Sequence, residues 1–297
     1  MNNSDSAAAS DSRNVLGKYL SLVKFSHTIF ALPFALIGFA LAVVYEQQTF
    51  KWKTFILMLL CMVFARSAAM AFNRYLDRKY DALNPRTAQR EVPAGIISAR
   101  NALLFTLVNC VLFVLATWFI NEICFYLSPV ALFVVLFYSY TKRFTALCHL
   151  VLGLGLSLAP IGAFLTVTGY FHLLPLLFSF AVITWVSGFD IIYALQDEAF
   201  DKKHQLHSIP VALGKKGALN LSVGLHIASA FCIIVAGYYA QFGWLYWIGA
   251  AVYVGMLIYQ HLLVKPDDLS KVNIAFMTAN GLASVVFAVF VILDLIV

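Results

Sequence analysis

Long apolar runs alternate with short polar segments along the whole chain after its first residues. A helix needs about 20 apolar residues to span a bilayer, and nine stretches meet that need, some of them separated only by tight turns. The stretches lie at residues 25–45, 54–73, 101–120, 123–141, 147–168, 172–195, 218–240, 243–263 and 273–296. The pattern predicts an all-α integral membrane protein with nine transmembrane helices.

Composition supports the bilayer as the solvent of this chain. Hydrophobic residues make up 62% of the 297 positions and charged residues 11%, whereas about a quarter of residues are charged in soluble domains. The partner expected from this composition is membrane lipid, and no nucleic-acid partner is expected. Residues 1–23 are polar and carry no signal-peptide pattern, which predicts a flexible cytoplasmic tail before a membrane domain at 24–297.

Basic residues are distributed unequally between the two sides. Lys and Arg concentrate in the cytoplasmic connections of membrane proteins. With the N-terminus inside, the outer connections contain only Lys51 and Lys53, Arg66 lies within a span, and the other 17 of the 20 basic residues lie on the inner side. We therefore expect a cytoplasmic N-terminus and, because nine is odd, a C-terminus on the outer side.

Two inner connections are longer than a hairpin requires and are rich in charge. They lie near 76–100 and 196–217, and long ordered loops in a compact domain tend to be functional. Each loop follows a helix end with polar residues spaced by four. We expect these loops to form a cytoplasmic cap over the site.

The two helix ends carry matching polar triads, Asn73/Asp77/Asp81 and Tyr193/Asp197/Asp201, with Asp190 nearly one turn before the second. On an α-helix, a spacing of four keeps three residues on one face, about 6 Å apart along the axis. Carboxylates near the membrane usually face a bundle interior or a watery cavity. Oxygen ligands on facing helices suit Mg²⁺, which commonly bridges carboxylates to substrate phosphates. The alternative is that these are ordinary solvated helix-end charges, which accounts less well for two matched triads.

Basic residues follow both triads closely. Arg86 and Arg90 come after the first, Lys202 comes after the second, and Lys142 and Arg143 lie in the connection between the fourth and fifth spans. Arg grips phosphate bidentately, and Lys acts as a point charge. Arg66 lies two turns before Asn73 on nearly the same face, which makes it a candidate partner of an anionic substrate. Metal ions with a ring of cations suit the binding and departure of a diphosphate.

These residues resemble a known family. NRYLDRKYD followed by NPRTAQREVPAG, and DIIYALQDEAFD followed by KKHQLHSIP, resemble the paired aspartate motifs of the UbiA superfamily of intramembrane prenyltransferases. KFSHTIFALPFALIG and YTKRFT resemble its first-helix and fourth-to-fifth-helix signatures. The likeness extends from about residue 18 to 296 and points most to the 4-hydroxybenzoate polyprenyltransferase-like enzymes.

The resemblance implies nine helices around a central cavity and a Mg²⁺-dependent reaction. A polyprenyl diphosphate ionises, and an aromatic acid such as 4-hydroxybenzoate attacks the allylic cation, as in ubiquinone biosynthesis. By position, the metal would be held by Asn73, Asp77, Asp81, Asp197 and Asp201. Asp190 and Tyr193 would line the site, and the diphosphate or the acceptor carboxylate would be contacted by Arg86, Arg90, Lys142, Arg143 and Lys202. The implied location is a bacterial inner membrane, with the active site facing the cytoplasm.

Two departures from the family pattern bear on the acceptor. Many relatives have Asn-Asp where this chain has Asn73-Arg74, and Arg-Pro-Leu-Pro where it has Arg90-Glu91-Val92-Pro93. A naphthoate-type acceptor in menaquinone synthesis therefore stands as an alternative. An alternative function from another class of membrane protein is ion-coupled transport. The carboxylates of such a transporter should lie near the bilayer midplane at broken helices.

Overall fold

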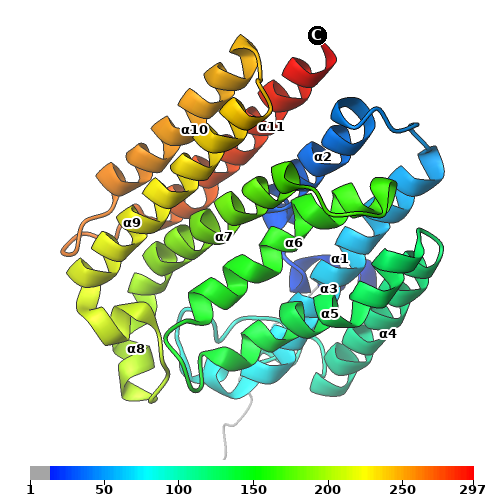
Figure 1. Ribbon diagram of the computed structural model, residues 1–297. Helices are drawn as coiled ribbons and strands as arrows, with labels where there is room; N and C mark the ends of the chain where they lie inside the picture. The colour runs from blue at the N-terminus through cyan, green and yellow to red at the C-terminus, as the bar shows by residue number, and fades with distance from the viewer. Residues whose placement is uncertain (1–13) are drawn as a thin grey trace, which may run out of the picture.

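The computed structural model describes residues 14–297 and is built from helices that run between two ends of one bundle (Figure 1). Within these residues, nine helices are long and apolar enough to cross a membrane. The α-helices are α1 (Val15–Leu22), α2 (Leu32–Ala40), α3 (Trp52–Leu83), α4 (Ala99–Trp118), α5 (Glu122–Thr141), α6 (Cys148–Thr168), α7 (Leu173–Ala194), α8 (Glu198–Lys203), α9 (Ile209–Tyr239), α10 (Trp244–Leu263) and α11 (Asn280–Ile296). The all-α membrane fold with nine spans is therefore confirmed.

Short 3₁₀ and π segments adjust the helix ends. They are η1 (Phe25–Phe30), η2 (Leu41–Tyr45), η3 (Leu195–Asp197) and η4 (Ile274–Ala279). The first span is thus η1, α2 and η2 in sequence, and the last is η4 followed by α11. Local sequence sets several of the ends: Asn121 accepts a hydrogen bond from the Cys124 N–H at the start of α5, and Gly169 adopts a left-handed φ of 70° after α6.

Helix α7 is the central helix of the bundle. Of its spanning segment, 61% is buried inside the protein, against 17% for α5 at the periphery. It packs between α6 and α9, and the main core forms around Trp185 with Phe34, Tyr253 and Phe287. Exposed Tyr126 and Leu262 lie on the outside, where the surrounding medium of a membrane protein is lipid.

The ends of the helices differ from the expected ones at three places. The segment 15–22, expected to be part of a flexible tail, forms α1, and Leu22 is fully buried; residues 1–13 lie outside the described residues. Helix α3 continues to Leu83, so the loop after it begins later than expected. The segment 196–217 is mostly helical, because it contains α8 and the start of α9.

One end of the bundle gathers the polar elements. Figure 1 shows α8 and the 84–98 loop together at the lower end and the C-terminus at the opposite end. The two triads belong to the lower end, which we call the aspartate end.

Gly153 lets α6 and α7 approach each other closely. A Cβ added at this position would lie 2.5 Å from both the Ile183 carbonyl oxygen and the Ser187 Oγ. Gly153→Ala is therefore expected to destabilise the bundle by about 1–3 kcal/mol, the usual cost of overpacking. Gly162→Ala on the same helix is the matched control, because no atom lies within 4 Å of its added Cβ. Thermal unfolding in detergent compares the two, and equal melting temperatures would contradict the expectation.

Candidate functional site

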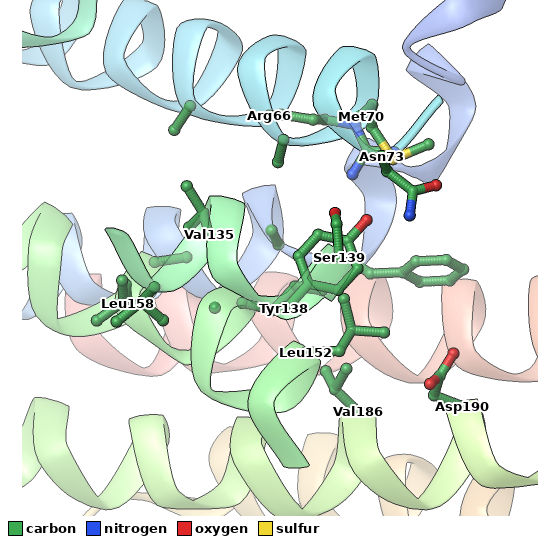
Figure 2. A pocket seen from close by; sticks show the side chains of 18 of the residues that line it. Arg66, Met70, Asn73, Val135, Tyr138, Ser139, Leu152, Leu158, Val186 and Asp190 are labelled. Atoms are coloured by element: carbon green, nitrogen blue, oxygen red, sulfur yellow. The ribbon is translucent and has the colours of Figure 1, made fainter. Parts of the chain in front are cut away.

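A cavity of about 940 Å³ opens between α3, α5, α6 and α7. Toward the aspartate end its lining is polar, and further along it becomes apolar, with residues such as Met58, Phe113, Leu127, Leu158 and Leu165. Figure 2 shows Arg66, Asn73, Tyr138 and Asp190 around the polar part, and Val135 and Leu158 further along. One site can therefore bind a charged group at one end and an apolar chain at the other.

The first triad keeps its predicted geometry because α3 remains a regular helix beyond it. The Asn73 Nδ2 donates to the Asp77 Oδ2 at 2.8 Å. The Arg143 Nη2 donates to the other Asp77 oxygen at 2.9 Å, and the Arg90 Nη1 forms an ion pair with Asp81 at 2.8 Å. The loop after α3 and the α5–α6 connection both contribute a cation to this one helix face.

The second triad is interrupted by a change of helix type. Tyr193 is the second-to-last residue of α7, Asp197 belongs to the 3₁₀ turn η3, and Asp201 lies in α8. The expectation that all three share one α-helical face is therefore wrong, because the tighter 3₁₀ turn rotates the residues that follow it. All three nevertheless line the same cavity as the first triad.

Asp197 holds the 84–98 loop to η3, the turn that follows α7. Arg86 forms a bidentate ion pair with it through Nε, at 3.0 Å, and Nη2, and the Asn84 Nδ2 adds a hydrogen bond at 3.1 Å. The Arg86 Nη1 also donates to the Tyr193 hydroxyl at 2.8 Å. Burial would lower the pKa of Arg86, but its bonds to Asp197 outweigh burial and raise it, so this guanidinium is a fixed cation.

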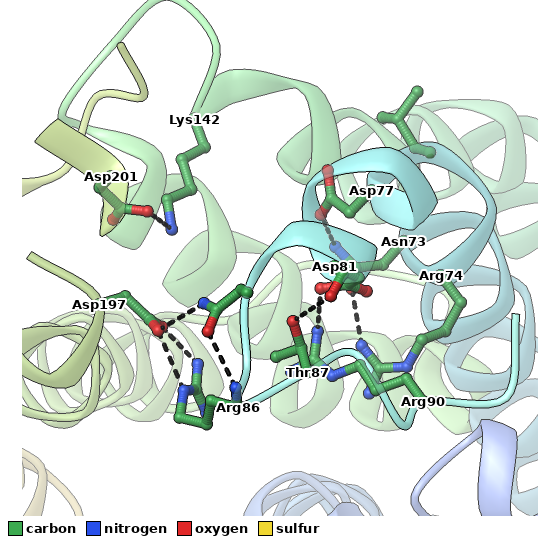
Figure 3. Close-up of polar contacts among 12 residues, drawn as sticks. Asn73, Arg74, Asp77, Asp81, Arg86, Thr87, Arg90, Lys142, Asp197 and Asp201 are labelled. Carbon is green, nitrogen blue, oxygen red and sulfur yellow. Dashed lines mark hydrogen bonds and ion pairs between the residues drawn. The ribbon is translucent and has the colours of Figure 1, made fainter. Parts of the chain in front are cut away.

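Asp201 is the most deeply buried of the four aspartates, and its carboxylate lies 2.8 Å from the Lys142 ammonium (Figure 3). Burial tends to lower the pKa of Lys142, yet the neighbouring Asp201 charge raises it above its usual value. The four aspartates of the triads thus have four different cationic partners: Arg143, Arg90, Arg86 and Lys142.

Several buried polar atoms at the site have no hydrogen-bond partner among the described residues. These are the Asp81 Oδ2, the Asp201 Oδ2, the Ser139 Oγ and the Nε atoms of Arg66 and Arg74. Buried polar groups are nearly always paired, so unpaired groups facing one cavity indicate a site for ligands that carry both oxygen acceptors and cations.

No group of three or more His, Cys, Asp or Glu side chains is close enough to hold a metal ion by itself, within residues 14–297. The donor set nevertheless fits Mg²⁺, because this ion is usually bound through one or two carboxylates together with substrate phosphates. The unpaired oxygens of Asp81 and Asp201 provide such carboxylates. A ready-made cage of protein ligands is not required.

All but one of the candidate residues from the sequence line the cavity. Lys202 is the exception: it is exposed on α8, outside the cavity lining, because the next residue along a helix points about 100° away from Asp201, which faces the cavity. Arg66 lines the cavity and donates to the Lys24 carbonyl oxygen at 3.0 Å. Sequence reasoning missed Asn84 and His149; Asn84 sits directly before Pro85 and ends α3, which was its only signal, whereas His149 lies in an apolar run without one.

The fold and the site define a class of protein. It is a membrane-embedded helical bundle whose cavity is lined by carboxylates and cations at one end and continues into apolar space. A family model described as the UbiA prenyltransferase family matches residues 31–282, and the chain belongs to this family. The resemblance inferred from the motifs and the prediction of a prenyltransferase are therefore confirmed.

Relatives and solved structures agree with this assignment. The 4-hydroxybenzoate octaprenyltransferase of Tolumonas auensis is 30% identical over 223 residues, 75% of this chain and 78% of that protein. The enzyme of the same name from Nitrosomonas europaea is 31% identical over 233 residues, 78% of this chain and 80% of its own.

Among solved structures, the apo form of a UbiA homolog from Aeropyrum pernix K1 matches with a TM-score of 0.78 and 30% identity, covering 91% of this chain and 97% of that one. A UbiA homolog from Archaeoglobus fulgidus bound to GPP and Mg²⁺ has the same fold, with a TM-score of 0.73 and 22% identity over 94% of this chain and 100% of that one.

Replacing Lys142 by Met tests the pairing of Asp201. The change leaves a buried carboxylate without its cation, and we expect a stability loss of about 2 kcal/mol. The double variant Lys142→Met/Asp201→Asn removes both charges and should recover much of the loss. Thermal unfolding of the wild type and both variants measures this; a double variant no more stable than the single one would contradict the pairing.

Proposed function

We propose that this chain transfers a polyprenyl group from a polyprenyl diphosphate to the ring of an aromatic acid, 4-hydroxybenzoate or a similar acid, in quinone biosynthesis. The observation that carries the proposal is the ring of four aspartate–cation pairs around one cavity that continues into apolar space. The names of the relatives support the reaction, and the GPP and Mg²⁺ in the Archaeoglobus fulgidus homolog support the donor and the metal.

Five side chains at the aspartate end would hold Mg²⁺. All offer hard oxygen ligands, and two of the carboxylates have buried unpaired oxygens; the set is Asn73, Asp77, Asp81, Asp197 and Asp201. When bound, Mg²⁺ neutralises phosphate charge and makes the diphosphate a better leaving group.

The cations of the four pairs have a second use when the donor arrives. Arg86, Arg90, Lys142 and Arg143 line the same cavity as the carboxylates, within reach of a group bound between them. With the donor bound, these cations would contact phosphate oxygens and stabilise the charge that develops on the departing diphosphate. The tail of the donor runs along the apolar part of the cavity.

The acceptor lies beyond the diphosphate, between Arg66, Tyr138 and Asp190. Arg66 is half-buried, and its Nε is buried without a hydrogen-bond partner among the described residues. A guanidinium recognises a carboxylate through paired hydrogen bonds. The aromatic faces of Tyr138 and Tyr193, which line the cavity, attract the allylic cation. The electron-rich ring of the acceptor then attacks that cation.

A naphthoate-type acceptor, as in menaquinone synthesis, is the alternative within the same reaction class. One observation supports this alternative acceptor. Arg74, a buried residue next to Asn73, borders the cavity with its guanidinium. The cavity therefore has more polar groups than a single benzoate needs. A panel of benzoate and naphthoate acceptors against donors of several lengths distinguishes the two.

A transporter is the less favoured reading of this bundle. Its carboxylates would be expected at broken helices near the midplane, whereas here they gather at one end of the bundle. The excess of basic residues in the connections at that end supports a cytoplasm-facing site in an inner membrane.

Asp77→Ala and Asp197→Ala test the metal site. Each is expected to lower Mg²⁺-dependent prenylation of 4-hydroxybenzoate in purified membranes by at least about a hundredfold, because several kcal/mol of charge stabilisation are lost. Asp267→Ala, an exposed carboxylate outside the cavity, is the matched control and should keep wild-type turnover. Chelation by EDTA should abolish activity and added Mg²⁺ restore it. Unchanged turnover in both cavity variants would overturn the assignment.

Arg66→Ala tests the acceptor site. Loss of a charge-assisted hydrogen bond worth about 2 kcal/mol should raise the KM for 4-hydroxybenzoate about thirtyfold and leave the KM for the donor unchanged. Methyl 4-hydroxybenzoate, which lacks the carboxylate, should be used equally poorly by the wild type and the variant. An increase confined to the donor KM would place Arg66 at the diphosphate.

A further inference from the structure

A fifth aspartate, Asp190, faces the cavity without a Lys or Arg partner among residues 14–297. Asp190 lies on α7, and its Oδ2 is 2.6 Å from the Nδ1 of His149, the second residue of α6. The His149 side chain is 4% exposed and that of Asp190 23% exposed, and both residues line the cavity. The four aspartates of the triads are paired with cations suited to phosphate, so Asp190 differs from them in its partner.

A backbone amide selects the tautomer of His149. The Ile209 N–H, at the start of α9, donates to the Nε2 of His149 at 3.4 Å. Because an N–H group can only donate, Nε2 carries the lone pair, and the neutral ring has its hydrogen on Nδ1. That hydrogen points at Asp190, and the separation of 2.6 Å is that of a short bond to a charged acceptor.

Three helices hold the pair in place. The Ser187 Oγ of α7 donates to the His149 carbonyl oxygen at 3.1 Å, and Ile209 fixes the far side of the ring from α9. The other oxygen of Asp190, Oδ1, has no hydrogen-bond partner within the part of the chain that the structure describes. Figure 2 shows this carboxylate at the edge of the cavity, turned toward the open space.

We propose that His149 is a positioning residue: it holds Asp190 as a carboxylate with one oxygen directed into the cavity, where that oxygen accepts the proton of the acceptor's ring hydroxyl. This inference rests on the proposed prenyl transfer and specifies the acceptor as an aromatic acid with a free ring hydroxyl. Its carboxylate would be held by Arg66 and its hydroxyl by Asp190.

The C–O bond of the donor breaks, and its electron pair leaves with the diphosphate. As Asp190 takes the hydroxyl proton, the oxygen's electrons move into the ring, and the ortho carbon forms the new C–C bond, leaving a dienone. The hydrogen on that carbon then departs as a proton to the diphosphate, its bonding pair restores the aromatic ring, and Asp190 returns its proton to the oxygen. No oxidant or reductant is needed.

His149→Ala and His149→Asn separate positioning from packing. The Asn amide nitrogen takes the place of Nδ1 and keeps the donor to Asp190, whereas Ala removes it. With saturating donor and Mg²⁺, His149→Ala should lower kcat for 4-hydroxybenzoate about tenfold to a hundredfold, a part of what a positioned acid–base group contributes, with a smaller change in KM. His149→Asn should recover most of kcat. The slow acceptor-free release of diphosphate should stay at the wild-type rate in both.

A second readout shows whether His149 acts through Asp190. In an Asp190→Asn background, His149→Ala should cost less than about twofold, because the two residues serve one step. 4-Methoxybenzoate, which has no hydroxyl proton, should be used at the same low rate by the wild type and His149→Ala.

His226 provides the matched control, because it is a buried histidine on α9 that lies outside the cavity and bonds to His261 at 2.7 Å. His226→Asn should leave kcat unchanged, and thermal unfolding checks that all variants fold. Equal kcat in the wild type and His149→Ala, or an equal loss in acceptor-free diphosphate release, would overturn the role of His149. A wild type that prenylates no hydroxylated aromatic acid would instead overturn the proposed function, and this inference with it.

Discussion

The enclosure of four carboxylates at one end of an apolar bundle, three of them buried and Asp77 half-buried, is the constraint on which the rest of this structure depends. An unpaired buried charge is costly, so each aspartate of the two triads needs a cation. The helices that carry the triads do not supply these cations. Arg86 and Arg90 come from the 84–98 loop, and Lys142 and Arg143 from the α5–α6 connection. The ion pairs therefore hold the connections against the helix ends and shape the mouth of the cavity.

The same pairing gives the site two arrangements of one set of charges. Without a donor, carboxylates and cations neutralise each other. In the proposed reaction, the carboxylates would hold the metal and the cations would contact the diphosphate. Each charged side chain would then still face a group of opposite charge. Little new charge would be buried in this exchange, so the proposed binding of a highly charged substrate in an apolar protein would carry a small desolvation cost.

Asp190 and Arg66 extend the site beyond the charges of the triads. Both face the cavity, yet neither belongs to a carboxylate–guanidinium or carboxylate–ammonium pair: Asp190 bonds to His149, and Arg66 donates to main-chain carbonyl groups. In the proposed reaction, a cavity divided in this way would offer one region to phosphate and metal and another to a smaller polar acceptor. The apolar remainder suits a prenyl tail.

The sequence by itself determined the nine spans, the helical geometry of Asn73, Asp77 and Asp81, and the family, because length, hydropathy and short motifs are local properties. Tertiary structure decided which charges meet. Asp197 and Arg86 are 111 residues apart, and the change to a 3₁₀ turn at η3 follows from packing that no spacing rule contains. His149 shows what the sequence could not predict, because it lies in an apolar run with no motif around it. Only the packing of α6, α7 and α9 gives its ring a hydrogen-bond donor on one side and an acceptor on the other.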